Sequence, residues 1–371
     1  MFEKLSTVAL QEYWWFLVAL LGGLFLFLTF VQGGQTKLGL AKDEAQKDLI
    51  VNALGRKWEL TFTTLVLFGG AIFAAFPLLY AVSFGGAYAL WMAILFSFII
   101  QAVAYEYRKK PNNFLGQKSY EAFLFINGTL GIFLIGVALG TFFSGAAFKL
   151  DAFRHMTWLS STRGLEELAV PFNLAFGAML LFLARLNGDL FLLYQIEEAE
   201  LQKRLRRSLL IDCALFLIFF LATMALLLTM DGFSVVGERV VKEPQKFLHN
   251  FLAQPWLLGF FLMGVVLFLA GVFMGYRHKR FAFWVAGAGI VAVGLSLLLL
   301  VGFNETPILP SVVDPGSSLT IHNASGSRTT LIAMSYVSLM IPFVLGYIAY
   351  VWRAMSRPLS EEEIKNDSMS Y

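Results

Sequence analysis

Cysteine and charge are both scarce in this sequence. A single cysteine, Cys213, occurs among the 371 residues, which excludes an internal disulfide and any paired-cysteine metal or redox motif. Only 14% of the residues are charged and 58% are hydrophobic, whereas soluble domains contain about 25% charged and about 45–50% apolar residues. The net charge of +3 is small and does not indicate nucleic-acid binding. The composition therefore excludes an ordinary soluble domain and predicts a membrane protein.

Histidine is scarce as well. A haem held between membrane helices needs axial ligands within the spans. The four histidines all fall in predicted loops or at predicted helix ends, at positions 155, 249, 278 and 322. Methionine thioethers in apolar helices usually fill the core. We therefore expect this chain to bind no haem and no other metal by itself.

What the sequence has in abundance is long apolar runs. Nine of them can cross the roughly 30 Å hydrocarbon core of a bilayer, and they do not alternate apolar and polar residues as barrel strands must. The runs cover residues 13–30, 60–80, 84–104, 122–143, 168–186, 209–230, 256–276, 281–303 and 331–352. The sequence thus predicts an all-α integral membrane protein, a bundle of about nine transmembrane helices forming one domain over residues 1–371 with a tail at 353–371.

The distribution of basic residues indicates the orientation. With nine spans the chain ends lie on opposite faces of the membrane, and lysine and arginine favour cytoplasmic connections. If the amino terminus is periplasmic, 20 of the 28 basic residues lie on the cytoplasmic side and 8 on the other. This asymmetry predicts a periplasmic amino terminus and a cytoplasmic carboxyl terminus.

Two carboxylates stand at the same predicted membrane boundary. Glu59 opens the second predicted span and Glu106 closes the third, and a short turn at residues 81–83 joins these spans into a hairpin. About 22 residues separate each acid from the turn, so both should lie at similar depth. Charges near the bilayer are functional candidates because they are costly there. Spacing alone leaves two interpretations open: the start of a proton path, or interfacial acids neutralised by basic neighbours. Those neighbours are Arg56, Lys57 and Arg108.

Four segments carry a resemblance to a known family. They are Asn52–Glu59, Gly69–Tyr80, Tyr105–Lys110 and Pro310–Ser325. In combination, and with the number and order of the spans, they resemble subunit II of the cytochrome bd-type quinol oxidases, including the cyanide-insensitive branch. The resemblance covers the whole chain and implies the membrane fold of that subunit.

The resemblance also implies roles for particular residues. It maps a proton path from the cytoplasm onto Trp58, Glu59 and Glu106. Where many members carry aspartates around a glycine after the first span, this chain has Gln32-Gly33-Gly34-Gln35. Neutral amides cannot exchange protons, so a role carried by those acids is absent or relocated here.

The family implies that catalysis happens in a complex. Subunit I would hold haem b and haem d and the quinol site, so this chain would have no catalytic or cofactor-binding residues of its own, with quinone as substrate or structural lipid. The expected partners are subunit I, membrane lipids, quinol and, in some complexes, a small accessory subunit, in the bacterial inner membrane. Two alternatives stay open, a secondary transporter, which would show interrupted helices and midplane polar groups, and a purely structural subunit.

Overall fold

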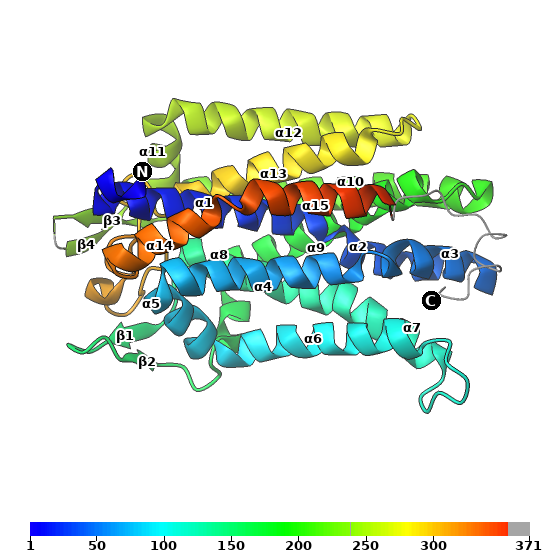
Figure 1. Ribbon diagram of the computed structural model, residues 1–371, viewed down its shortest axis with the longest axis horizontal. Helices are drawn as coiled ribbons and strands as arrows, with labels where there is room; N and C mark the ends of the chain where they lie inside the picture. The colour runs from blue at the N-terminus through cyan, green and yellow to red at the C-terminus, as the bar shows by residue number, and fades with distance from the viewer. Residues whose placement is uncertain (238, 355–371) are drawn as a thin grey trace.

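The protein is a bundle of long helices that run roughly parallel to one another (Figure 1). The computed structural model describes residues 1–237 and 239–354. Within these residues, nine helical segments are long and apolar enough to cross a bilayer. A cluster of buried hydrophobic side chains runs through the bundle. The predicted all-α membrane fold is thereby confirmed, while residues 355–371 of the predicted tail, with the acidic run Glu361–Glu363, lie outside the described residues.

Several spans are made of consecutive helical pieces. In chain order the nine spans are α1, α2 and η2 (Thr7–Leu28, Phe30–Gln35, Thr36–Leu40); α3 and α4 (Glu44–Gly55, Trp58–Ala75); α6 (Tyr88–Tyr107); α7, η4 and α8 (Gln117–Ile126, Asn127–Gly131, Ile132–Ser144); α9 (Pro171–Gln195); α10 (Ala199–Thr229); α12 (Pro255–Tyr276); α13 (Ala282–Leu300); and α14 and α15 (Arg328–Ser338, Ile341–Ala354).

The two ends of the bundle differ. At one end, the hairpin end, lie the amino terminus and two small antiparallel hairpins, β1–β2 and β3–β4 (Figure 1). At the opposite end, the α3 end, lie α3 and the turns that follow α6, α9 and α12. The remaining short elements are η1 (Phe2–Lys4), α5 (Pro77–Tyr80), η3 (Ala81–Gly86), β1 (Phe148–Leu150), β2 (Met156–Trp158), η5 (Leu165–Ala169), β3 (Gly232–Val236), β4 (Arg239–Glu243), α11 (Lys246–Ala253) and η6 (Pro315–Ser317).

The first two spans differ in extent from the sequence prediction. The first continues to Leu40 rather than ending at residue 30, and it therefore includes Lys37. The second begins at Glu44 and ends at Ala75, because Pro77 has no backbone N–H to continue the helix. The predicted turn at residues 81–83 is part of a π-helical turn over Ala81–Gly86, which holds more residues per turn than an α-helix.

Glycines bring α2 into direct backbone contact with α9. A Cβ added at Gly33 would lie 1.8 Å from the carbonyl oxygen of Ala184, and one at Gly188 would lie 2.3 Å from the backbone nitrogen of Gly34. No real side chain tolerates such distances, so only glycine fits at Gly33 and Gly188. This close approach places the residues that follow α2 against α9 and α10.

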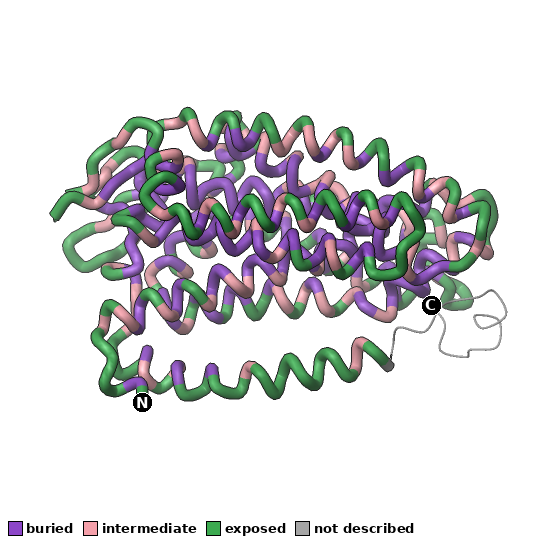
Figure 2. The backbone as a smooth tube through the Cα atoms, turned by 90° about the horizontal axis from the view of Figure 1, so that it is seen from above, coloured by how far each residue is buried: buried purple, intermediate pink, exposed green. Residues whose placement is uncertain are grey.

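Some spans are far more exposed than others. Figure 2 shows the last span standing at the edge of the bundle, largely exposed along its length, with Tyr347 67% and Tyr350 74% accessible. The exposed apolar faces of α4, α6, α10 and α12 include Phe73, Phe96 and Val266. Such faces suit lipid or a partner membrane subunit.

Candidate functional site

The structure places the three predicted proton-path residues at the α3 end. Trp58 and Glu59 begin α4, and Glu106 lies in the last turn of α6. The indole of Trp58 stacks on the ring of Tyr105, with 5.9 Å between the ring centroids. The side chain of Glu106 is 58% exposed and lies 3.2 Å from the ammonium of Lys110, and Glu59 is also exposed. The two acids therefore both lie at the α3 end of the helical hairpin that α4 and α6 form, as the spacing predicted.

A cavity of about 300 Å³ adjoins Glu59. It lies between the start of α4 and the last span, and its lining includes Trp58, Glu59 and Trp352. The ammonium of Lys57 sits 4.9 Å from the ring centroid of Trp352. The carboxylate of Glu59 thus has room for water on a side that the last span partly covers.

Buried amides continue inward from the Trp58–Tyr105 stack. The side-chain amide of Gln35 donates to the Tyr105 hydroxyl at 3.2 Å, and that of Gln32 donates to the Gln101 side-chain oxygen at 3.4 Å. All three glutamines are fully buried. Further in, Asn127 donates to the hydroxyl of Ser97 at 3.2 Å. A row of polar groups therefore leads from the α3 end into the bundle, and it passes through the Gln32–Gln35 segment.

Arg108 does not neutralise Glu106. Its guanidinium, 1% exposed, pairs with Asp48 at 2.8 Å and Glu121 at 2.8 Å, and more weakly with Glu44 at 3.4 Å. Asp48 and Glu44 lie on α3 and Glu121 lies on α7, so Arg108 joins the end of α6 to α3 and to the start of α7. Of the three basic neighbours expected to neutralise the acids, Arg108 therefore pairs with other carboxylates instead.

A buried ion cluster is the site that sequence reasoning missed. Lys37, in η2, has a fully buried side chain whose ammonium lies 2.8 Å from Asp189 and also bonds Asp212. Arg185 donates to the other oxygen of Asp212 at 2.9 Å. The hydroxyl of Ser208 lies 2.8 Å from the ammonium. Two cations and two carboxylates thus meet among three spans, which leaves the cluster formally neutral.

One signal in the sequence could have found part of this cluster. Asp212 falls inside the predicted sixth span, and an acid within an apolar run is by default a functional candidate. Lys37 and Asp189 were hidden because the predicted first and fifth spans ended at residues 30 and 186. Their pairing spans a sequence separation of 152 residues and depends on the contact between α2 and α9.

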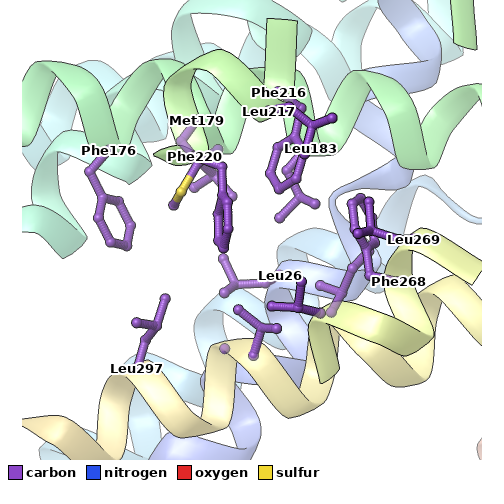
Figure 3. A pocket seen from close by; sticks show the side chains of 15 residues that line it. Leu26, Phe176, Met179, Leu183, Phe216, Leu217, Phe220, Phe268, Leu269 and Leu297 are labelled. Carbon is purple, nitrogen blue, oxygen red and sulfur yellow. The ribbon is translucent and has the colours of Figure 1, made fainter. Parts of the chain in front are cut away.

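A second cavity is purely apolar. Figure 3 shows Phe176, Met179 and Leu183 of α9 facing Leu26 and Leu297 across it, with Phe216 and Phe220 of α10 beside them. The cavity amounts to about 50 Å³, and its lining comes from α1, α9, α10, α12 and α13. An apolar lining cannot move protons, and the cavity is much smaller than the roughly 300–1,000 Å³ of typical ligand pockets.

All four histidines lie outside the spans. Each hydrogen-bonds a polar side chain at an end of the bundle, and none of them lies in a span. The pairs are His155 with Asp151, His249 with Glu243, His278 with Arg206, and His322 with Gln11. In the described part of the chain no group of three or more histidine, cysteine, aspartate and glutamate side chains could hold a metal ion. These residues do not fit a haem between the helices.

Glu167, outside the spans at the hairpin end, is a buried acid. Its side chain belongs to η5 and accepts a hydrogen bond of 3.0 Å from Asn173. Burial, reinforced by the neighbouring Glu166 carboxylate, raises the pKa of Glu167 to about 7. For Glu166, burial is outweighed by hydrogen bonds from Thr162, Trp158 and the Gly164 backbone, and its pKa is lowered. The two adjacent acids therefore titrate in different pH ranges.

Glu167 should make stability fall as pH rises. A carboxyl with a raised pKa binds more protons in the folded state, so its contribution is fully present below about 4.5 and is lost by about 7. The shift from 4.5 to about 7 corresponds to roughly 3–4 kcal/mol. We expect Glu167→Gln to raise the thermal unfolding midpoint of the purified complex at pH 8 and to leave it unchanged at pH 4.5. The matched variant Glu166→Gln should lower the midpoint at pH 8. An equal effect of Glu167→Gln at both pH values would contradict the assignment.

The fold and the site together define a class of protein. In the described part of the chain, nine helices long and apolar enough to cross a bilayer define an all-α integral membrane protein. The fold is similar to that of the bd oxidase from Geobacillus thermodenitrificans, with a TM-score of 0.67 and 16% identity over 97% of this chain and 100% of that chain. The sequence model of the family described as cytochrome bd terminal oxidase subunit II matches residues 10–355. The chain belongs to this family.

Individual relatives agree over their full length. Cytochrome bd-I ubiquinol oxidase subunit 2 of Escherichia coli is 26% identical, with 97% of this chain and 98% of the relative covered. Cytochrome bd ubiquinol oxidase subunit 2 of Bacillus subtilis is 25% identical over 96% of this chain and 98% of the relative. The chain is therefore subunit II of a bd-type quinol oxidase, a multi-pass protein of the bacterial inner membrane that works with a subunit I. Because the chain belongs to this oxidase family, the alternative that it is a secondary transporter is wrong.

Proposed function

We propose that this chain is the haem-free subunit of the oxidase and that it brings cytoplasmic protons toward the oxygen-reducing site. Reduction of oxygen to water by quinol consumes protons, and we infer that haem b, haem d and the quinol site lie in subunit I. The observation that carries the proposal is the position of Glu59 and Glu106 at one end of the hairpin formed by α4 and α6, beside the Trp58–Tyr105 stack.

The direction of this path follows from the orientation. The α3 end carries the larger share of the basic residues, so we place it in the cytoplasm and the amino terminus in the periplasm. Glu59 and Glu106 then face the bulk supply of protons. Their exposure lets both exchange protons with water.

The polar groups that lead from Tyr105 into the bundle are side-chain amides. Amides can form hydrogen bonds with water but cannot exchange protons. The amides of Gln35 and Gln32 lie behind the Tyr105 hydroxyl, where the family resemblance implies acids. We propose that the titrating step in this chain rests on Glu59 and Glu106, and that the buried amides orient water between them and the partner. We also propose quinone as substrate or structural lipid, and this rests on the family resemblance, because the apolar cavity of about 50 Å³ is too small for its hydrocarbon chain.

The test is quinol oxidase turnover of the assembled complex. Glu59→Gln and Glu106→Gln keep the shape of the side chain but remove its exchangeable proton, so each should slow oxygen consumption, and the double variant should slow it about tenfold or more. Haem content and assembly should be unchanged. Glu59→Asp should retain most of the turnover.

A matched control separates a proton role from a scaffold role. Glu200→Gln removes an exposed acid from the start of α10 at the same end of the bundle, and it should leave turnover at the wild-type rate. Normal turnover in both single variants and in the double variant would leave Glu59 and Glu106 as interfacial acids, and would favour a purely structural subunit.

A further inference from the structure

A small cavity with a basic rim lies at the α3 end, away from Glu59. It has a volume of about 220 Å³ and is formed where the end of α9, the start of α10 and the turn between α12 and α13 meet. Leu190, Leu193 and Phe283 give it apolar walls, and Lys279 and Arg280 line it with positive charge. A cavity that is apolar on one side and cationic on the other suits an amphiphile with an anionic head.

The turn that presents the two cations is firmly held. α12 ends at Tyr276 and α13 begins at Ala282, so only five residues connect them. The backbone N–H of Lys279 donates to the Met274 carbonyl at 2.9 Å, and His278, with φ of 59°, adopts the left-handed conformation that ends many helices. The positions from which Lys279 and Arg280 project are therefore fixed before any ligand binds.

Carboxylates of the described residues do not neutralise the positive charge of this turn. No carboxylate of residues 1–237 or 239–354 forms an ion pair with Lys279, Arg280 or the adjoining Arg206. Arg206 instead donates to the ring of His278, with 2.6 Å between the nitrogens. One acid, Glu197, lines the cavity and is exposed. The cations outnumber the acids, so the cavity attracts an anion.

The surface beside the cavity is apolar and faces outward. On α12, Phe273 is 60% and Val266 65% exposed, and Phe281 in the turn is 70% exposed. The guanidinium of Arg277 lies 5.4 Å from the ring centroid of Phe273, an arrangement typical of a basic side chain at the boundary between hydrocarbon and water. Acyl chains can lie along α12 while a headgroup enters the cavity.

We propose that this cavity binds the phosphate headgroup of an anionic phospholipid. Lys279 and Arg280 contact the phosphate, and the acyl chains lie against the exposed face of α12. The volume of about 220 Å³ is far above the roughly 10–15 Å³ that a cavity needs to hold one water, which leaves room for a phosphate group and a few waters. Basic residues are common on cytoplasmic turns, but basic pockets between helices are the form that binds lipid headgroups.

The test compares two lipids on the purified oxidase complex. The complex is placed in nanodiscs of phosphatidylcholine with increasing fractions of phosphatidylglycerol, and the retained lipid is counted by native mass spectrometry. The wild type should retain phosphatidylglycerol in preference to phosphatidylcholine. Lys279→Gln with Arg280→Gln should weaken that retention about 30-fold, since each cation near a membrane surface contributes roughly a factor of five.

A matched double variant guards against a general charge effect. Lys203→Gln with Arg207→Gln removes two exposed cations of α10 that do not line the cavity, and it should retain phosphatidylglycerol as the wild type does. Equal losses in the two double variants, or no loss in either, would overturn the proposal. Full displacement of the lipid by millimolar inorganic phosphate would also overturn it, because it would show a site for the free ion.

Discussion

Lys37→Met is expected to remove most of the assembled oxidase from the membrane. The substitution leaves Asp189 and Asp212 buried with Arg185 as their remaining cation. Removing one partner of a buried ion pair costs about 3–5 kcal/mol, against a total stability of about 5–15 kcal/mol for typical domains. The amount of complex in isolated membranes and its thermal unfolding midpoint both report this loss.

A compensating substitution distinguishes charge imbalance from lost packing. Lys37→Met combined with Asp189→Asn restores neutrality, because Arg185 still pairs with Asp212 at 2.9 Å. Asp189 is the acid to change, since its second oxygen has no hydrogen-bond partner among the described residues. The double variant should recover most of the assembled complex. Lys109→Met, which removes a lysine whose side chain is 42% exposed, should have little effect. A double variant as depleted as Lys37→Met would contradict the electrostatic account.

Hydropathy was sufficient to predict the helices but not their ends. An apolar run of about 20 residues must be a helix in lipid, because each backbone polar group needs a partner within the segment. The segment after residue 30 contains glutamines, glycines and Lys37. These residues are unfavourable in a single helix that is surrounded by lipid. They stay within the span because α9 and α10 surround them. The predicted end of the first span was therefore wrong because other helices, rather than lipid, surround this part of it.

The candidate site shows the same limit. The common end of Trp58, Glu59 and Glu106 followed from spacing along one hairpin, which is local information. The stack of Trp58 on Tyr105 was not predicted, although both residues belong to segments that carry the family resemblance. The pairing of Lys37 with Asp189 and Asp212 joins three spans and could not follow from any periodicity.

For the segment Gln32-Gly33-Gly34-Gln35, the sequence and the structure each explain a different property. The sequence showed that its amides cannot exchange protons, and this remains true in the fold. The structure adds the reason for its glycines, since Gly33 meets the Ala184 carbonyl and Gly34 meets Gly188. That contact brings the next residues of the chain, including Lys37, to the acids of α9 and α10.

The most direct test of the central claim, that the haems lie in the partner subunit, is the haem content of a histidine-free variant of this chain. All four histidines, His155, His249, His278 and His322, are replaced by alanine, and the variant is purified with subunit I. The visible absorption spectrum and a pyridine haemochrome assay then give haem b and haem d per assembled complex. We predict the wild-type haem content and the same spectrum, because these histidines lie at the ends of the bundle. Loss of a stoichiometric haem from complexes that still contain both subunits would contradict the account.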